Sequence, residues 1–228
     1  IISQSMHNQV EARNHRSQLT IGMPRVLLMY SLAPLFRGYF ESLGIQKDNI
    51  LFSDFTTEKL YRSGCKRGAI DPCYPAKVSL AHVHNLLYPT NRRKKPDVIF
   101  APMVCDLKSE LSNTLGNWIC SAIVASSESV KAAFTKEENI FEQEGVKYIN
   151  TFLNLEEPAL FEIQMYKDFS NLLGLSREEN HRAAQAGFEA LKNYKEWRKS
   201  RAKEVLEQME KEGKIGIVLL GRPYHNDP

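Results

Sequence analysis

The clearest strand pattern in the chain is the run Asp97-Val98-Ile99-Phe100-Ala101-Pro102. Its uninterrupted apolar residues, closed by a proline, are typical of a strand covered on both faces of a parallel sheet. Further strands are predicted at 26–30, 50–52, 68–70 and 119–125. Helical spacing of apolar residues predicts helices between them, at 35–43, 56–63 and 76–87, with another beginning at 128. This alternation predicts an α/β fold in which a parallel sheet is flanked by helices.

The composition changes along the chain, and four parts are expected. Residues 1–20 lack an apolar period and are interpreted as a linker or arm, and residues 21–155 as the α/β domain. Residues 156–212 form a helical segment rich in Glu, Lys and Arg, in which Ser176 and Glu179 make a capping box. Residues 213–228 contain the strand 214–220, interpreted as the start of a second, truncated α/β unit. Both ends are interpreted as cuts in a longer protein.

The bulk composition excludes several classes of protein. With 43% hydrophobic and 25% charged residues and a net charge of +3, the chain is ordinary for a globular protein and too weakly basic to indicate nucleic-acid binding. No apolar run approaches the ~20 residues of a membrane span, and no export signal is present. A cytoplasmic location is therefore expected. Cysteines stay reduced there, so the four cysteines are interpreted as ligands, reactive thiols or core residues.

Two cysteines follow predicted strands within proline-containing loops, Asp71-Pro72-Cys73-Tyr74-Pro75 and Ala101-Pro102-Met103-Val104-Cys105. Ligands of open α/β sheets gather at the carboxyl ends of strands, so these thiols are candidate metal ligands, and Cys120 is a less certain third. Cys65 is interpreted as a strand-entry residue. The alternative is that the thiols fill space in the core, as free cysteine often does. The chain contains no Cys-x-x-Cys pair, so the sequence does not predict a zinc ribbon.

The remaining polar candidates are histidines and the C-terminal loop. His82 and His84 stand two apart on a predicted helix, so they face different directions, and one buried and one exposed histidine is expected. After the strand 214–220, Arg222 is suited to an anionic group, and Tyr224 and His225 to proton transfer. The alternative is that these side chains tie the loop together. No phosphate-binding loop, dinucleotide fingerprint or serine elbow is present.

Several motifs, in order along the chain, resemble one family. Ile21-Gly22-Met23-Pro24-Arg25-Val26-Leu27, Asp71-Pro72-Cys73-Tyr74-Pro75-Ala76-Lys77, His82-Val83-His84-Asn85 and Gly221-Arg222-Pro223-Tyr224-His225-Asn226-Asp227-Pro228 are similar to landmarks of the domain that follows the ATPase modules of large CoA-enzyme activases. The resemblance covers about residues 21–228. That domain is related to 2-hydroxyacyl-CoA dehydratases and double-cubane cluster proteins.

The resemblance implies an iron–sulfur cluster, of 4Fe-4S or double-cubane type, and low-potential electron transfer in anaerobic metabolism. Cys73 is the best-matched ligand, Cys105 the next, and Cys120 a possible third by position. The ATPase modules are not in this segment, so ATP would act only through a separate activator. The expected partners are that ATP-hydrolysing activator, an acyl-CoA or another small molecule, and, in a homodimer, a second copy of the chain. Nucleic acid and membrane are not expected.

Three interpretations of function remain open at this point. In the first, the chain is the iron–sulfur component of an ATP-driven reductase or 2-hydroxyacyl-CoA dehydratase-like system, with Arg222 binding substrate and His225 or Tyr224 moving protons. In the second, it is a non-catalytic docking domain of a fused activase. In the third, its cysteines hold a structural zinc ion. The first makes the chain part of an enzyme, and the other two do not.

Overall fold

A four-stranded parallel sheet forms the centre of the computed structural model, which describes residues 11–68, 73–89, 94–109, 113 and 116–221. The strand order is β2-β1-β3-β5, and every neighbouring pair is parallel. The strands are β1 (Ile21–Met23), β2 (Ile50–Phe52), β3 (Val98–Phe100) and β5 (Lys147–Ile149). The predicted fold class, a parallel sheet flanked by helices, is confirmed.

A second, two-stranded parallel sheet pairs β4 (Met103–Asp106) with β6 (Phe152–Asn154). It continues the β3–β5 ladder beyond a short break, because Ala101 N donates to Ile149 O and Met103 N donates to Thr151 O across the gap. Pro102, in the middle of the break, has no N–H to donate. The chain therefore runs from β3 into β4 with one irregular step, and Cys105 lies on β4.

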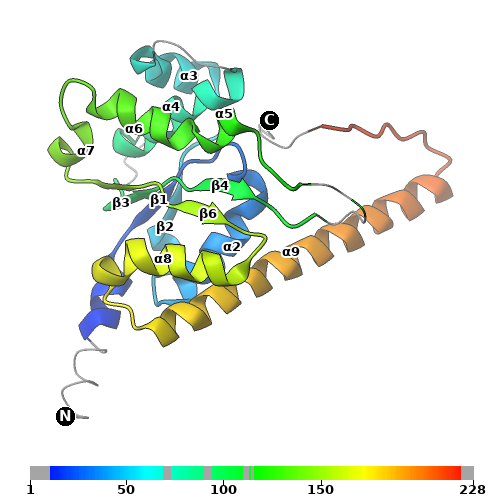
Figure 1. The fold of residues 1–228 in the computed structure, drawn as a ribbon. Helices are drawn as coiled ribbons and strands as arrows, with labels where there is room; N and C mark the ends of the chain where they lie inside the picture. Colours follow the sequence, from blue (N-terminus) through cyan, green and yellow to red (C-terminus); the bar gives the residue numbers. More distant parts are fainter. Residues whose placement is uncertain (1–10, 69–72, 90–93, 110–112, 114–115, 222–228) are drawn as a thin grey trace.

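Helices cover both faces of the sheet (Figure 1). On one face lie α2 (Met29–Ser42), α8 (Pro158–Leu173) and α9 (Arg177–Lys211). On the other face lie α4 (Tyr74–Leu87), α6 (Ser126–Thr135) and α7 (Ile140–Gln143), with α3 (Glu58–Gly64) packed on α4 and α5 (Ser121–Val124) leading into α6. Two single-turn 3-10 helices span Lys47–Asn49 and Cys65–Arg67. No helix of the described ranges has the length and apolarity of a membrane span.

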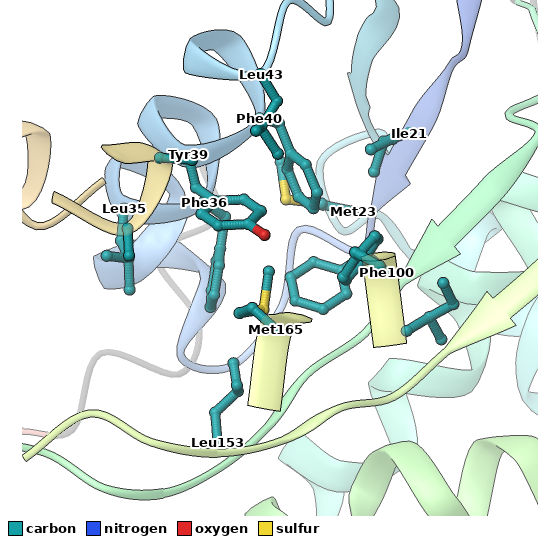
Figure 2. Packing of buried hydrophobic residues seen from close by; sticks show 14 of the residues in the cluster. Ile21, Met23, Leu35, Phe36, Tyr39, Phe40, Leu43, Phe100, Leu153 and Met165 are labelled. Carbon is teal, nitrogen blue, oxygen red and sulfur yellow. The ribbon is translucent and has the colours of Figure 1, made fainter. Parts of the chain in front are cut away.

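The larger core lies between the sheet and α2, α8 and α9, and it is rich in aromatic rings (Figure 2). The Phe100 ring of β3 meets the rings of Phe36 and Phe40 edge-on, with centroids 5.1 and 5.5 Å apart. All three side chains are fully buried. Burying such side chains contributes about 1.5–3 kcal/mol each, so this cluster fixes α2 against the sheet. The second core lies under α4, α6 and α7.

The helices α2 and α9 pack with their backbones close together on that face. Gly38 and Gly187 lie at the crossing, where a Cβ added to Gly187 would sit 2.7 Å from Leu35 O. A larger residue at either glycine would push the helices apart. Beyond the crossing, α9 extends away from the body of the domain (Figure 1).

Residues 11–18, part of the expected linker, are helical. Arg16 anchors them, because its guanidinium is 2% exposed, donates to Leu43 O at 3.2 Å and pairs with Glu179 at 2.8 Å. This segment therefore packs against the C-terminal end of α2 and the N-terminal end of α9.

Three predicted strands differ from the structure. The strand predicted at 26–30 is absent, and the first strand lies earlier, at Ile21–Met23. The apolar run 26–30 instead forms a turn followed by the buried first turn of α2. The segment 119–125 contains the helix α5 instead of a strand. Residues 214–220 pair with no strand in the described part of the chain, and their apolar side chains are exposed. Gly68 is irregular, and 69–70 lie outside the described residues.

Candidate functional site

Cys73 occupies the N-cap position of α4, with extended backbone and Pro75 in the first helical turn. Pro75 suits that position because the first turn needs no intrahelical N–H donor there. The N-terminal end of a helix carries a partial positive charge and favours anionic groups such as a thiolate. The local sequence therefore places this thiol at the N-terminal end of α4.

Cys120 is the N-cap residue of the short helix α5 and lies close to the same part of the fold. Both Cys73 and Cys120 pack, partly buried, against one small apolar cluster, whose buried members are Val26, Leu27, Val78 and Ile123. Leu27 follows β1, so this cluster, here called the Leu27 cluster, sits beyond the carboxyl end of that strand. Two of the three predicted ligands thus border one apolar cluster.

Cys105 is tied to the loop that carries Cys120, because Ile119 N donates to Cys105 O at 2.9 Å. Its Sγ donates to Asp106 Oδ2 at 2.9 Å and to Leu153 O at 3.3 Å. Burial, together with the bond to Asp106, raises the pKa of the Cys105 thiol to about 11. At neutral pH this thiol therefore keeps its proton.

Cys65 stands apart from these three thiols. It is buried beside Leu60 and Ala81, and its Sγ donates to Lys77 O at 3.6 Å. It lies in a 3-10 turn after α3, not at the start of a strand. Its environment is that of a core thiol, which makes Cys65 a suitable control for experiments on the others.

The donor set has the right chemistry for a soft metal centre but is not assembled into one. Among the residues that the structure describes, no three His, Cys, Asp or Glu side chains lie close enough together to hold a metal ion. Holding a cluster would therefore require the thiol-bearing loops to approach further or another ligand to join them. Arg222, Tyr224 and His225 lie outside the described residues.

A buried polar network follows β2, and the sequence predicted only a buried histidine. His82, fully buried on α4, is hydrogen-bonded to Ser53 Oγ at Nδ1 (2.7 Å) and to Thr56 Oγ1 at Nε2 (3.0 Å). Ser53 Oγ also accepts from Arg25 N, which follows β1. Both ring nitrogens of His82 are therefore engaged, and neither is open to a metal ion. The sequence predicted that one of His82 and His84 is buried, without saying which, and the Ser53 and Thr56 partners carry no motif that could have revealed them.

His84 lies on another side of α4 and is half-buried. Its Nδ1 is buried without a hydrogen-bond partner, and its ring lies 4.8 Å from that of Tyr88. Burial, and then the nearby Arg67, lower the pKa of His84. The expectation of two histidines in different environments is met, although His84 is less exposed than predicted.

Fold and site together define an open parallel α/β domain in which Cys73 and Cys120 border an apolar cluster beyond the carboxyl end of β1, with Cys105 on β4. A family model described as "CoA enzyme activase uncharacterised domain" matches residues 20–228, and the chain belongs to that family. The match confirms the resemblance inferred from the motifs. No curated protein and no solved structure matches the chain.

Proposed function

We propose that this domain is the iron–sulfur-dependent component of an anaerobic, ATP-driven reductase or 2-hydroxyacyl-CoA dehydratase-like system. The observation that carries the proposal is the packing of Cys73 and Cys120 around the Leu27 cluster, with Cys105 hydrogen-bonded to the neighbouring Ile119. Cysteine thiolates are the usual ligands of iron–sulfur clusters. Membership of the CoA enzyme activase family supports a role beside an activator.

Cys73, Cys105 and Cys120 would hold the cluster, which when bound would supply one-electron transfer. Cys73 would reach the cluster from the N-cap position of α4. The apolar side chains of the Leu27 cluster would keep water away from the thiolates. Because Cys105 is protonated at neutral pH, its use as a ligand would release a proton.

The partners follow from the same proposal. An ATP-hydrolysing activator would deliver electrons, and an acyl-CoA or another small molecule would receive them. Arg222 would bind an anionic group of that substrate through its bidentate guanidinium, and His225 or Tyr224 would supply a proton.

Anaerobic reconstitution with iron and sulfide tests the cluster directly. We expect the wild-type chain to bind both and to show charge-transfer absorbance. Cys73→Ser should lose most of the bound iron, whereas Cys65→Ser should retain it because Cys65 lies in a different core cluster.

The same measurement separates the alternatives. Equal iron content in wild type and Cys73→Ser would contradict the proposed ligand set. Bound zinc without charge-transfer absorbance would identify a structural zinc site instead. A chain that binds neither metal after reconstitution would favour the docking domain.

A further inference from the structure

A cavity lies beyond the carboxyl end of the sheet, between the segments that follow β1 and β3. Pro24 and Leu27 line it from the first segment, Ala101 and Pro102 from the second, and side chains of α2, α4 and α6 close it. The chain leaves β1 for β2 on one side and reaches β3 on the other. Open α/β sheets bind ligands where the strand order reverses in this way.

Among the described residues, one buried hydroxyl group on the cavity wall has no hydrogen-bond partner. Ser79, on α4, lines the cavity and is 4% exposed, and its Oγ is buried without a hydrogen bond. Two other wall hydroxyls are satisfied, because Ser126 Oγ donates to Ile123 O at 2.7 Å and Tyr148 OH donates to Ser127 O at 2.9 Å. A buried hydroxyl without a partner costs about 1–3 kcal/mol, so a ligand that bonds to Ser79 would recover that energy.

The backbone beside the cavity is strained. Leu27 has a φ of 56°, in the left-handed region, and is a non-glycine residue with a buried side chain on the cavity wall. Such a conformation costs on the order of 1–3 kcal/mol and is concentrated at functional sites. This strained conformation is found at a residue of the cavity wall, next to the point between β1 and β3 where the strand order reverses.

The size of the cavity and the polarity of its wall restrict which ligands can bind in it. The cavity volume is about 40 Å³, and one water needs about 10–15 Å³, so a chain of about three carbons and one oxygen fits. Most of the lining side chains are apolar, and Ser79 Oγ is the buried oxygen among them that lacks a hydrogen bond within the described part of the chain, so an aliphatic chain with one oxygen matches the wall. Among the described residues that line the cavity none is charged, and an ionised ligand would therefore be buried unpaired.

We propose that this cavity binds a short, neutral aliphatic chain carrying one oxygen, as in a small alcohol or an acyl group, with that oxygen hydrogen-bonded to Ser79 Oγ. The proposal goes beyond the iron–sulfur assignment, because Cys73, Cys105 and Cys120 are not among the described residues that line the cavity. Its test uses metal-free protein, so either proposal can fail without the other.

The test is a titration of the metal-free chain, labelled at the methionine methyl groups, followed by NMR. Met29 lines the cavity and reports on its occupancy. We expect 1-propanol to shift the Met29 methyl signal saturably in the millimolar range, and propionate, of similar size but charged, to leave it unshifted. A Met29→Leu sample assigns the signal.

Two variants connect the binding to the cavity. Ser79→Ala should weaken 1-propanol binding about tenfold, because one hydrogen bond is lost. Val83→Ile adds a methylene group to the wall and should abolish the saturable shift. Thermal melting checks that both variants are folded. No saturable shift in the wild type, equal affinity in Ser79→Ala, or equal binding of propionate would overturn the proposal.

Discussion

At the residue scale, the ion pair between Arg16 and Glu179 joins segments 163 positions apart in the chain. Arg16 is almost fully buried, whereas the Glu179 side chain keeps 22% exposure and also caps α9 with Ser176. Burial by itself would raise the pKa of Glu179, but the hydrogen bond from Ser176 N and the pair with Arg16 outweigh it, so the pKa lies below its ordinary value. The buried guanidinium thus depends on this carboxylate.

Glu179→Gln should therefore destabilise the domain by about 2 kcal/mol at neutral pH, because the amide still caps the helix but leaves the Arg16 charge unpaired. Urea unfolding measures the change. Glu178→Gln, in the same helical turn, is the matched control, since its pair with Arg182 is exposed and should contribute less than about 1 kcal/mol. Equal losses in the two variants would contradict a special role for the buried pair.

The same variant has a defined pH dependence. Because the folded state lowers the pKa of Glu179, its stabilisation is fully present above the ordinary carboxyl pKa and is lost as the pH falls through the lower folded value. The difference in unfolding free energy between wild type and Glu179→Gln should thus be constant near neutral pH and should shrink in acid. A difference that grows on acidification would have the wrong sign.

The capping box of Ser176 and Glu179 was predicted from sequence and is confirmed, because its residues are three apart and its geometry is local. Arg16 could not be predicted as the partner, since nothing local distinguishes it from the other arginines of the chain. The site residues differ in the same way, because some are recognisable from the local sequence and others only from the fold. Cys73 stands out by its proline-flanked loop, whereas Ser53 and Thr56 acquire a role only when folding brings α4 beside β2.

At the element scale, prediction succeeded where an element carries a long, distinctive pattern. The strand at 98–100 was recognised from its uninterrupted apolar run. β5 was missed because Lys147-Tyr148-Ile149 is short and begins with an exposed lysine. The run 26–30 was misassigned because the first turn of α2 is apolar on the side that the core covers, and a short apolar segment has no period that separates strand from helix.

The crossing of α2 and α9 leads to a prediction at this scale. Gly187→Ala should destabilise the domain by about 2 kcal/mol, because the new methyl group would meet the backbone oxygen of Leu35, which cannot rotate away. On helix propensity alone the change would stabilise by about 1 kcal/mol, so the sign distinguishes packing from propensity. Asn193→Ala, at an exposed position of α9, is the control and should leave the melting temperature unchanged or raise it.

At the scale of the whole molecule, the layered arrangement follows from the alternating pattern of strands and helices, but one apolar segment remains unpacked. Residues 215–220 were predicted as a buried strand, yet the side chains of Ile215, Ile217, Val218, Leu219 and Leu220 are all more than 80% exposed. A strand of this kind needs neighbours on both edges and both faces, and the described part of the domain provides none for it. Its assignment to a second α/β unit remains a prediction.

The exposed run should make the chain self-associate, since contiguous apolar segments without partners bind one another. Val218→Lys should shift sedimentation-velocity profiles towards monomer while leaving the melting temperature unchanged, because the 81% exposed side chain contributes little to the fold. Ala202→Lys adds the same charge at an exposed position of α9 and should not alter association, which separates the loss of apolar surface from the gain of charge. A lower melting temperature in Val218→Lys would instead place this segment inside the folded domain, and its exposure could then no longer explain the association.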